Sequence, residues 1–194
     1  MSESIEKTSQ GENKLITERR EKLDRLRDGN AFPNDFRRDS LAGELLSAYG
    51  ERKASAFDRE SISVRVAGRM MAKRVMGKAS FVKIQDSSGQ IQLYVERDRV
   101  SAETYQAFKS WDVGDILGAE GELFKTKTGE LSVRTGNLRL LVKSLRPMPE
   151  KWHGLVDQEL KLRQRYLDLI VSDETRHVFQ IRREIIRFLR SSLD

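Results

Sequence analysis

Two short stretches of alternating apolar and polar residues, joined by a four-residue turn, constrain the fold of this chain most strongly. The stretches cover residues 80–85 and 90–96, and the linking sequence at 86–89 is Asp-Ser-Ser-Gly, which is typical of a tight hairpin turn. Alternation of this kind predicts strands that bury one face each in a core. The apolar residues on the buried faces are Val82, Ile84, Ile91, Leu93 and Val95.

The same counting places Phe81 and Gln92 on the opposite face of these two strands. An aromatic ring on the solvent side of a sheet, paired with an amide, is typical of a surface that stacks an unstacked nucleic-acid base. The pattern fits equally well a ring that is covered by a helix or by the N-terminal segment. Alternation alone favours neither interpretation.

Further strands flank this hairpin. Alternation over 62–67, followed by Gly68 as a bulge or sharp coil, predicts a long first strand. Residues 115–124 and 131–145 predict a fourth and a fifth strand. Residues 101–111 change to helical spacing, with Ser101 as the expected cap. The order of three strands, one helix and two strands predicts a five-stranded OB-fold barrel, so the expected fold class is mainly β.

Composition predicts four segments along the chain. Residues 1–13 are polar and are expected to be disordered, and residues 14–60 form an N-terminal extension of amphipathic helices. The barrel occupies 61–146, and 147–194 is predicted to be a linker followed by helices. Because the apolar stripe of the last helix reaches the end of the chain without a stop signal, we expect a truncated protein. The predicted helices are 14–28, 41–49, 157–171 and 173–193.

Charge and residue usage narrow the classes of function. Lys and Arg exceed Asp and Glu by 36 to 30, which fits a polyanionic partner or merely a basic, soluble surface. The absence of cysteine excludes disulfides, thiol catalysis and cysteine zinc sites, and is compatible with a reducing cytoplasm. No apolar run is long enough to span a bilayer, so we expect a cytoplasmic protein without a membrane partner. His153 and His177 are isolated, so no metal site and no catalytic residue is predicted.

Three basic residues are expected at or just beyond the end of the first strand, beside the loop that leads to Phe81. They are Arg69, Lys73 and Arg74. A phosphate or base-edge site and a solvated basic loop both fit this pattern. Glu130, at the tip of the predicted hairpin between the fourth and fifth strands, could accept a hydrogen bond from a base, although one exposed loop glutamate indicates little by itself.

Five segments, in order and with consistent spacing, resemble a known family. They are residues 66–71, 77–81, 91–95, 124–131 and 163–169. Together they resemble the bacterial lysyl-tRNA synthetases, which are class II enzymes, and the resemblance runs from about Leu23 to the last residue. It implies that 147–194 is a linker and the start of the class II catalytic domain, truncated within the first class II motif, and that the rest of this domain lies beyond this chain.

The resemblance also implies roles for individual residues. The barrel would bind the anticodon of lysine tRNA, with its central uridine stacked on Phe81 and read by Gln92. Glu130 would contribute a further contact. The family also uses an arginine just after the first strand, and its usual Arg-Arg pair is Lys73-Arg74 here. Either member of this pair could take that role.

For the full-length enzyme, the resemblance implies ligation of lysine to tRNA with ATP and Mg²⁺, in a homodimer. We expect the 194-residue chain to bind the anticodon stem-loop of lysine tRNA, to be inactive alone and to bind no cofactor. Two alternatives stay open. One is an aspartyl- or asparaginyl-tRNA synthetase, whose barrels use a similar phenylalanine and glutamine, although residues 163–169 and the Met70-Met71 pair favour lysine. The other is a non-catalytic single-strand-binding protein, against which the unfinished last helix argues.

Overall fold

The structure is a computed structural model that describes residues 2–27, 29, 31–149 and 157–193, with side chains described from residue 14 onward. The chain divides into two compact units, Met1–Pro147 and Met148–Asp194. The first unit contains the strands and the second contains helices only within its described residues.

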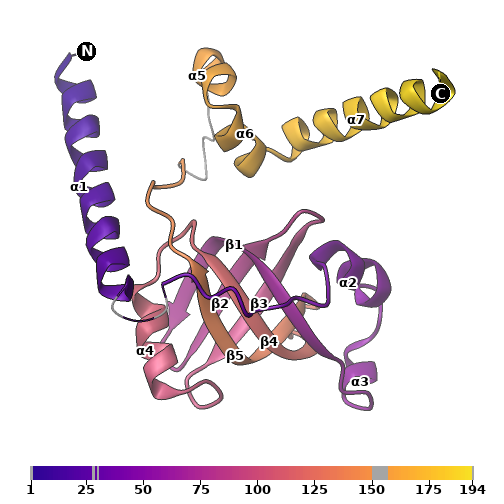
Figure 1. The fold of residues 1–194 in the computed structure, drawn as a ribbon. Helices are drawn as coiled ribbons and strands as arrows, with labels where there is room; N and C mark the ends of the chain where they lie inside the picture. Colours follow the sequence, from indigo (N-terminus) through magenta and orange to yellow (C-terminus); the bar gives the residue numbers. More distant parts are fainter. Residues whose placement is uncertain (1, 28, 30, 150–156, 194) are drawn as a thin grey trace. The chain divides into compact units, whose positions relative to one another are not determined.

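Five strands close into a barrel in the order β1-β2-β3-β5-β4 (Figure 1). Their bounds are β1 Ser63–Met76, β2 Ala79–Gln85, β3 Gln90–Glu96, β4 Ile116–Lys125 and β5 Leu131–Val142. Neighbouring strands pair antiparallel, except that β3 and β5 pair parallel. Helix α4, Ala102–Ser110, connects β3 to β4. The predicted order of three strands, one helix and two strands is therefore confirmed.

The barrel core follows the predicted alternation. In β2 and β3 every second residue is buried, beginning with Ser80 and Ile91. Met70 and Phe108, from β1 and α4, are fully buried in the same apolar core. Helix α4 begins at its predicted cap, because the Ser101 hydroxyl accepts a hydrogen bond of 3.1 Å from the amide of Thr104.

Strand β1 is long, as the sequence predicted. Its bulge lies between Met70 and Ala72, two residues beyond the Gly68 position where a bulge or sharp coil was expected. Gly68 serves a close approach, since a Cβ atom at this position would lie 2.7 Å from the carbonyl oxygen of Gln85. The three basic residues expected at or just beyond the end of the first strand all lie within β1: Arg69, Lys73 and Arg74. The interpretation of their neighbourhood as a solvated basic loop is therefore wrong.

Three helices precede the barrel, namely α1 Ser2–Arg27, α2 Ala42–Tyr49 and α3 Ala54–Phe57. Helix α2 matches its prediction, whereas α3 was not predicted. The structure extends α1 back to Ser2, through the segment for which disorder was predicted. That segment contains no proline, so no residue in it lacks the amide donor that a helix requires.

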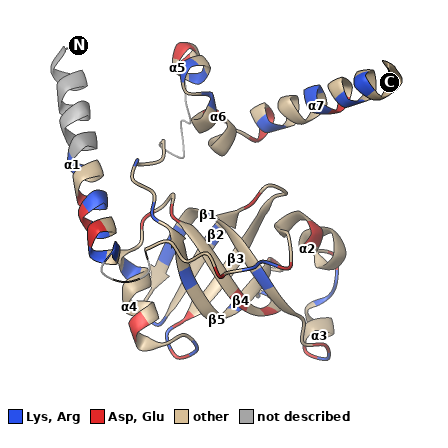
Figure 2. Ribbon diagram, in the orientation of Figure 1, with Lys and Arg blue, Asp and Glu red and all other residues tan. Residues whose placement is uncertain are grey.

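The C-terminal half of α1 is anchored to the rest of the first unit by two cations. The guanidinium group of Arg19, which is buried, donates hydrogen bonds to the carbonyl oxygens of Ser144 and Arg146 at 3.3 and 2.9 Å. The ammonium group of Lys22 lies 2.8 Å from the Asp112 carboxylate. Figure 2 shows that this half of α1 carries both basic and acidic residues. Charged contacts therefore supplement its thin apolar stripe.

A buried ion network lies next to these contacts. Lys143, which follows β5, lies 2.6 Å from the carboxylate of Asp112 and 2.7 Å from that of Asp115. Lys143 and Asp115 are both buried. Burial raises the pKa of Asp112, but hydrogen bonds from Lys143 and Lys22 outweigh burial and hold this pKa below its ordinary value. The network thus ties the end of β5 to the turn before β4.

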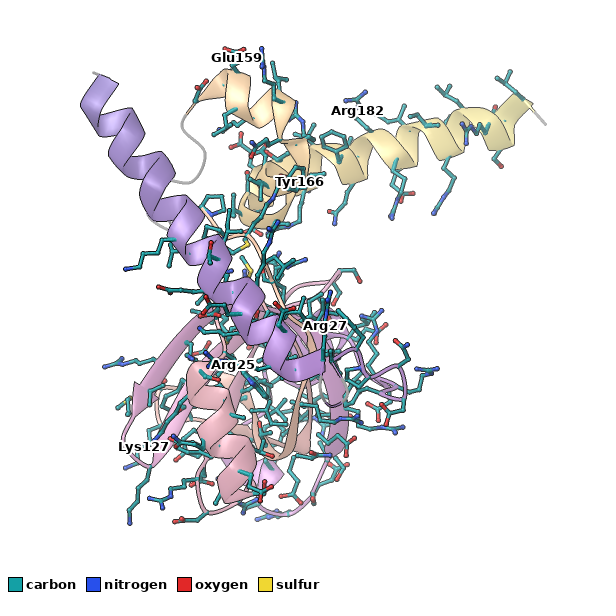
Figure 3. All side chains as sticks on the ribbon, turned by 60° about the vertical axis from the view of Figure 1, so that its left-hand side comes forward. Arg25, Arg27, Lys127, Glu159, Tyr166 and Arg182 are labelled. Carbon is teal, nitrogen blue, oxygen red and sulfur yellow. The ribbon has the colours of Figure 1, made fainter. Side chains whose placement is uncertain are left out.

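The second unit contains α5 Gln158–Arg163, α6 Arg165–Val171 and α7 Asp173–Leu193. The prediction of one helix over 157–171 was wrong, because Gln164 leaves the helical conformation, with φ −116° and ψ 53°. The helix predicted at 173–193 is confirmed, and Figure 3 labels Arg182 on it. Its exposed apolar side chains are Val178, Phe179, Ile181, Ile185, Ile186, Phe188, Leu189 and Leu193.

The described residues lack two features that other classes of protein use. None of the helices they form is long and apolar enough to cross a membrane. They also contain no group of three or more His, Cys, Asp or Glu side chains placed to hold a metal ion. His177 is exposed on α7, and His153 lies outside the described residues.

Candidate nucleic-acid interface

The solvent side of β2 and β3 brings the two outward-facing residues of the sequence analysis onto one surface. Phe81 is the register partner of Tyr94, and Lys83 is the register partner of Gln92. Phe81 and Gln92 are half-buried, while the residues on either side of each are buried. The ring and the amide therefore lie on the same barrel face, two register positions apart along the strands.

Polar groups line one edge of this face. The Gln92 amide donates a hydrogen bond of 2.9 Å from Nε2 to the Ser132 hydroxyl, which fixes the orientation of the side chain. The carboxylate of Glu130 lies 3.2 Å from the ammonium group of Lys83. Glu130 thus contacts the register partner of Gln92, so the structure places both predicted polar residues together. In the same β4–β5 loop, Lys127 projects outward (Figure 3).

Two further rings extend the face, and the sequence analysis did not single them out. The ring centroids of Phe81 and Tyr94 are 5.1 Å apart, and those of Tyr94 and Phe124 are 5.6 Å apart. We call Phe81, Tyr94 and Phe124 the aromatic row. The guanidinium carbon of Arg134 lies 4.6 Å from the centroid of the Phe124 ring. The same alternation that placed Phe81 outward would have placed Tyr94 outward, two residues after Gln92.

Tyr94 is the polar member of the aromatic row. Burial raises the pKa of its hydroxyl, and the nearby carboxylate of Glu96 raises it further, while the charge of Arg134 lowers it. The net direction is upward, so the phenol is neutral around neutral pH. The row therefore presents neutral rings with a cation at one end.

Lys73, predicted as a binding residue, points away from the aromatic row. Its ammonium group donates hydrogen bonds to three carbonyl oxygens at the C-terminal end of α4, of which that of Trp111 is nearest at 2.6 Å. Burial lowers the pKa of Lys73. Unpaired carbonyl groups at a helix end are a natural place for a cation. The structure thus engages Lys73 in holding α4 against β1.

The other two basic residues also differ from each other. Arg69 donates a hydrogen bond of 2.8 Å to the carbonyl oxygen of Gly114, so its guanidinium group has a contact within the fold. Arg74 is exposed and is the register partner of Phe81 on β2. Because adjacent residues on a strand point to opposite sides, Arg74 faces the aromatic row while Lys73 faces α4.

The region that carries this face matches a known family. Residues 64–141, from β1 to β5, match the family model for tRNA anticodon-binding domains, described as an OB-fold nucleic acid binding domain. The barrel has the OB-fold, which is the fold of the matched family. The matched range includes the whole aromatic row and all six residues that the sequence analysis predicted as binding residues.

Curated relatives extend the similarity beyond the OB-fold. The chain is 59% identical over 186 residues to the lysine–tRNA ligase of Thioalkalivibrio sulfidiphilus, and 57% identical over 183 residues to that of Dechloromonas aromatica. These alignments cover 95% and 94% of the chain. The chain is thus homologous to lysine–tRNA ligases over nearly its whole length. It spans 37% and 36% of the length of these two relatives.

Proposed function

We propose that this chain binds the anticodon loop of a lysine tRNA through the aromatic row and its polar edge. The observation that carries the proposal is the placement of Phe81, Gln92 and Glu130 on one face of the OB-fold. In this arrangement the central base stacks on the ring of Phe81, and a base of any identity can make this contact. The Gln92 amide can donate and accept hydrogen bonds, so it can read the Watson-Crick edge of that base. The homology to lysine–tRNA ligases supports a lysine anticodon as the target.

We extend the proposal to a longer protein of which this chain is the anticodon-recognition portion. That protein would activate lysine with ATP and transfer it to tRNA. ATP, Mg²⁺, a homodimer and a cytoplasmic location belong to the proposal for that longer protein. Since the described residues bring together no group of metal-ligating side chains, we assign none of them a role in binding Mg²⁺.

The test of the proposal is a comparison of central bases. We expect the chain to bind a synthetic RNA stem-loop with a lysine anticodon more tightly than the same stem-loop with cytidine at the central anticodon position. In Gln92→Ala this preference should shrink by about 0.5–1.5 kcal/mol, because one direct hydrogen-bonding side chain is lost. Fluorescence anisotropy titrations of both RNAs give the preference.

The matched control is Gln106→Ala, which removes an exposed glutamine from α4 and should leave the preference unchanged. If the wild-type chain bound all central bases equally, the barrel would be a single-strand-binding domain without anticodon selectivity. If Gln92→Ala kept the full preference, the reading role would belong to another residue.

A second prediction separates the two neighbouring cations of β1. Replacing Arg74 with alanine should reduce the slope of log affinity against log salt concentration by about 1, as expected for one lost phosphate contact. Replacing Lys73 with alanine should leave this slope unchanged and lower the free energy of unfolding by about 1–3 kcal/mol, because carbonyl groups at the end of α4 lose a charged donor. Salt titrations and urea unfolding measure the two effects. The reverse outcome would assign the RNA contact to Lys73.

A further inference from the structure

The aromatic row is longer than the proposed recognition of one base requires. A single stacked base needs one ring, and Phe81 supplies it. Tyr94 and Phe124 continue the row across β3 and β4, with successive centroids 5.1 and 5.6 Å apart. The face therefore has an aromatic surface beyond the position of the first base.

Ser132 explains how rings from two strands that are not neighbours come into contact. Strand β5 lies between β3 and β4, and Ser132 on β5 is the register partner of both Gln92 and Phe124. Its side chain is small and fully buried, so Tyr94 and Phe124 can meet above it. A large side chain at this position would separate the two rings.

Arg134 lies against the last ring of this surface and has one buried polar atom without a partner among the described residues. It is half-buried, and its guanidinium carbon lies 4.6 Å from the centroid of Phe124. Its Nε atom is buried and has no hydrogen-bond partner among the described residues. A buried N–H without a partner is unfavourable, so an apolar side chain would suit the packing of β5 better. The guanidinium group instead lies against the ring of Phe124, on a residue that is the register partner of Tyr94 in the aromatic row.

We propose that Arg134, held against the ring of Phe124, forms a second base-stacking position that takes a nucleotide adjacent to the one on Phe81. Guanidinium planes stack on unpaired bases as aromatic rings do. Contact with Phe124 orients the plane before RNA binds, which reduces the conformational entropy lost on binding. This inference rests on the proposed function, because it places a second nucleotide of the same loop.

Arg134→Lys distinguishes stacking from a phosphate contact. Lysine keeps the positive charge but lacks the plane. The probe is the stem-loop with a lysine anticodon, used with the complete 194-residue chain. We expect Arg134→Lys to weaken binding about fivefold or more, with an unchanged dependence on salt concentration. Arg139→Lys is the matched control, because it makes the same change on the same strand at a residue that pairs with Asp35.

Stem-loops with one abasic nucleotide identify the base that is stacked. Removing one of the two bases that flank the central anticodon base should abolish the effect of Arg134→Lys. Removing the central base should abolish the effect of Phe81→Ala instead. If Arg134→Lys binds like wild type, or if its loss persists with each flanking base removed, the second stacking position is wrong. Should Phe81→Ala also bind like wild type, the proposed function itself fails, so the two failures are distinguishable.

Discussion

Replacing Lys143 with methionine is expected to lower the free energy of unfolding by about 3–5 kcal/mol, the largest effect we predict for a single substitution. Lys143 lies 2.7 Å from Asp115, and both side chains are buried. Without the ammonium group, the buried side chain of Asp115 has lost its ion-pair partner. Asp112, 2.6 Å from Lys143, loses one of its two cations as well. Unfolding in urea measures the loss.

Two further variants make this prediction specific to burial. Lys127→Met removes an exposed lysine from the β4–β5 loop and should change stability by no more than about 0.5 kcal/mol. Asp112→Asn, at a carboxylate that is only partly buried, should give a smaller loss than Lys143→Met and remains measurable if the latter fails to fold. If Lys143→Met and Lys127→Met were equally stable, the network would contribute nothing to the fold.

The barrel was predictable from the sequence because its signal is local. Alternation in β2 and β3, the turn between them and the cap at Ser101 each involve residues close together along the chain. The position of the bulge in β1 was not predictable in the same way. Gly68 suggests a bulge when it is read alone, and only the neighbouring carbonyl of Gln85 on β2 shows that it permits a close approach. Likewise, no glycine or proline marks the break between α5 and α6 at Gln164.

The site was predictable in part, for the same physical reason. Period-two counting placed Phe81 and Gln92 outward, and it also holds for Tyr94, which the sequence analysis left aside. The position of Phe124 depends on the pairing of β4 with β5, which no local pattern contains. The partners of Lys73 are backbone carbonyls of α4, so no sequence motif marks them. Adjacent cations on one strand therefore needed the structure to separate them.

For RNA binding, the largest expected effect belongs to Phe81. Replacing it with alanine should weaken binding of the lysine-anticodon stem-loop by about 1–3 kcal/mol, or about 5-fold to 150-fold in Kd. The reason is the loss of the ring on which the central base stacks, and with it the first ring of the aromatic row, 5.1 Å from Tyr94. Because stacking is insensitive to base identity, the variant should lose affinity for every central base by a similar factor. Fluorescence anisotropy measures both quantities.

Phe32→Ala is the matched control for this prediction. Phe32 is 50% exposed and precedes the barrel, so the substitution removes a ring of the same size from a position outside the aromatic row. It should leave the affinity for RNA unchanged. Thermal unfolding of both variants shows whether weaker binding comes from the lost contact with RNA or from unfolding of the protein. This check is needed because Phe81→Ala also removes the packing against Tyr94. A folded Phe81→Ala chain that binds RNA as tightly as Phe32→Ala would show that the ring packs against the sheet without stacking a base. Alternation left open whether the ring of Phe81 stacks a base or only packs within the protein, and these two substitutions decide between the two.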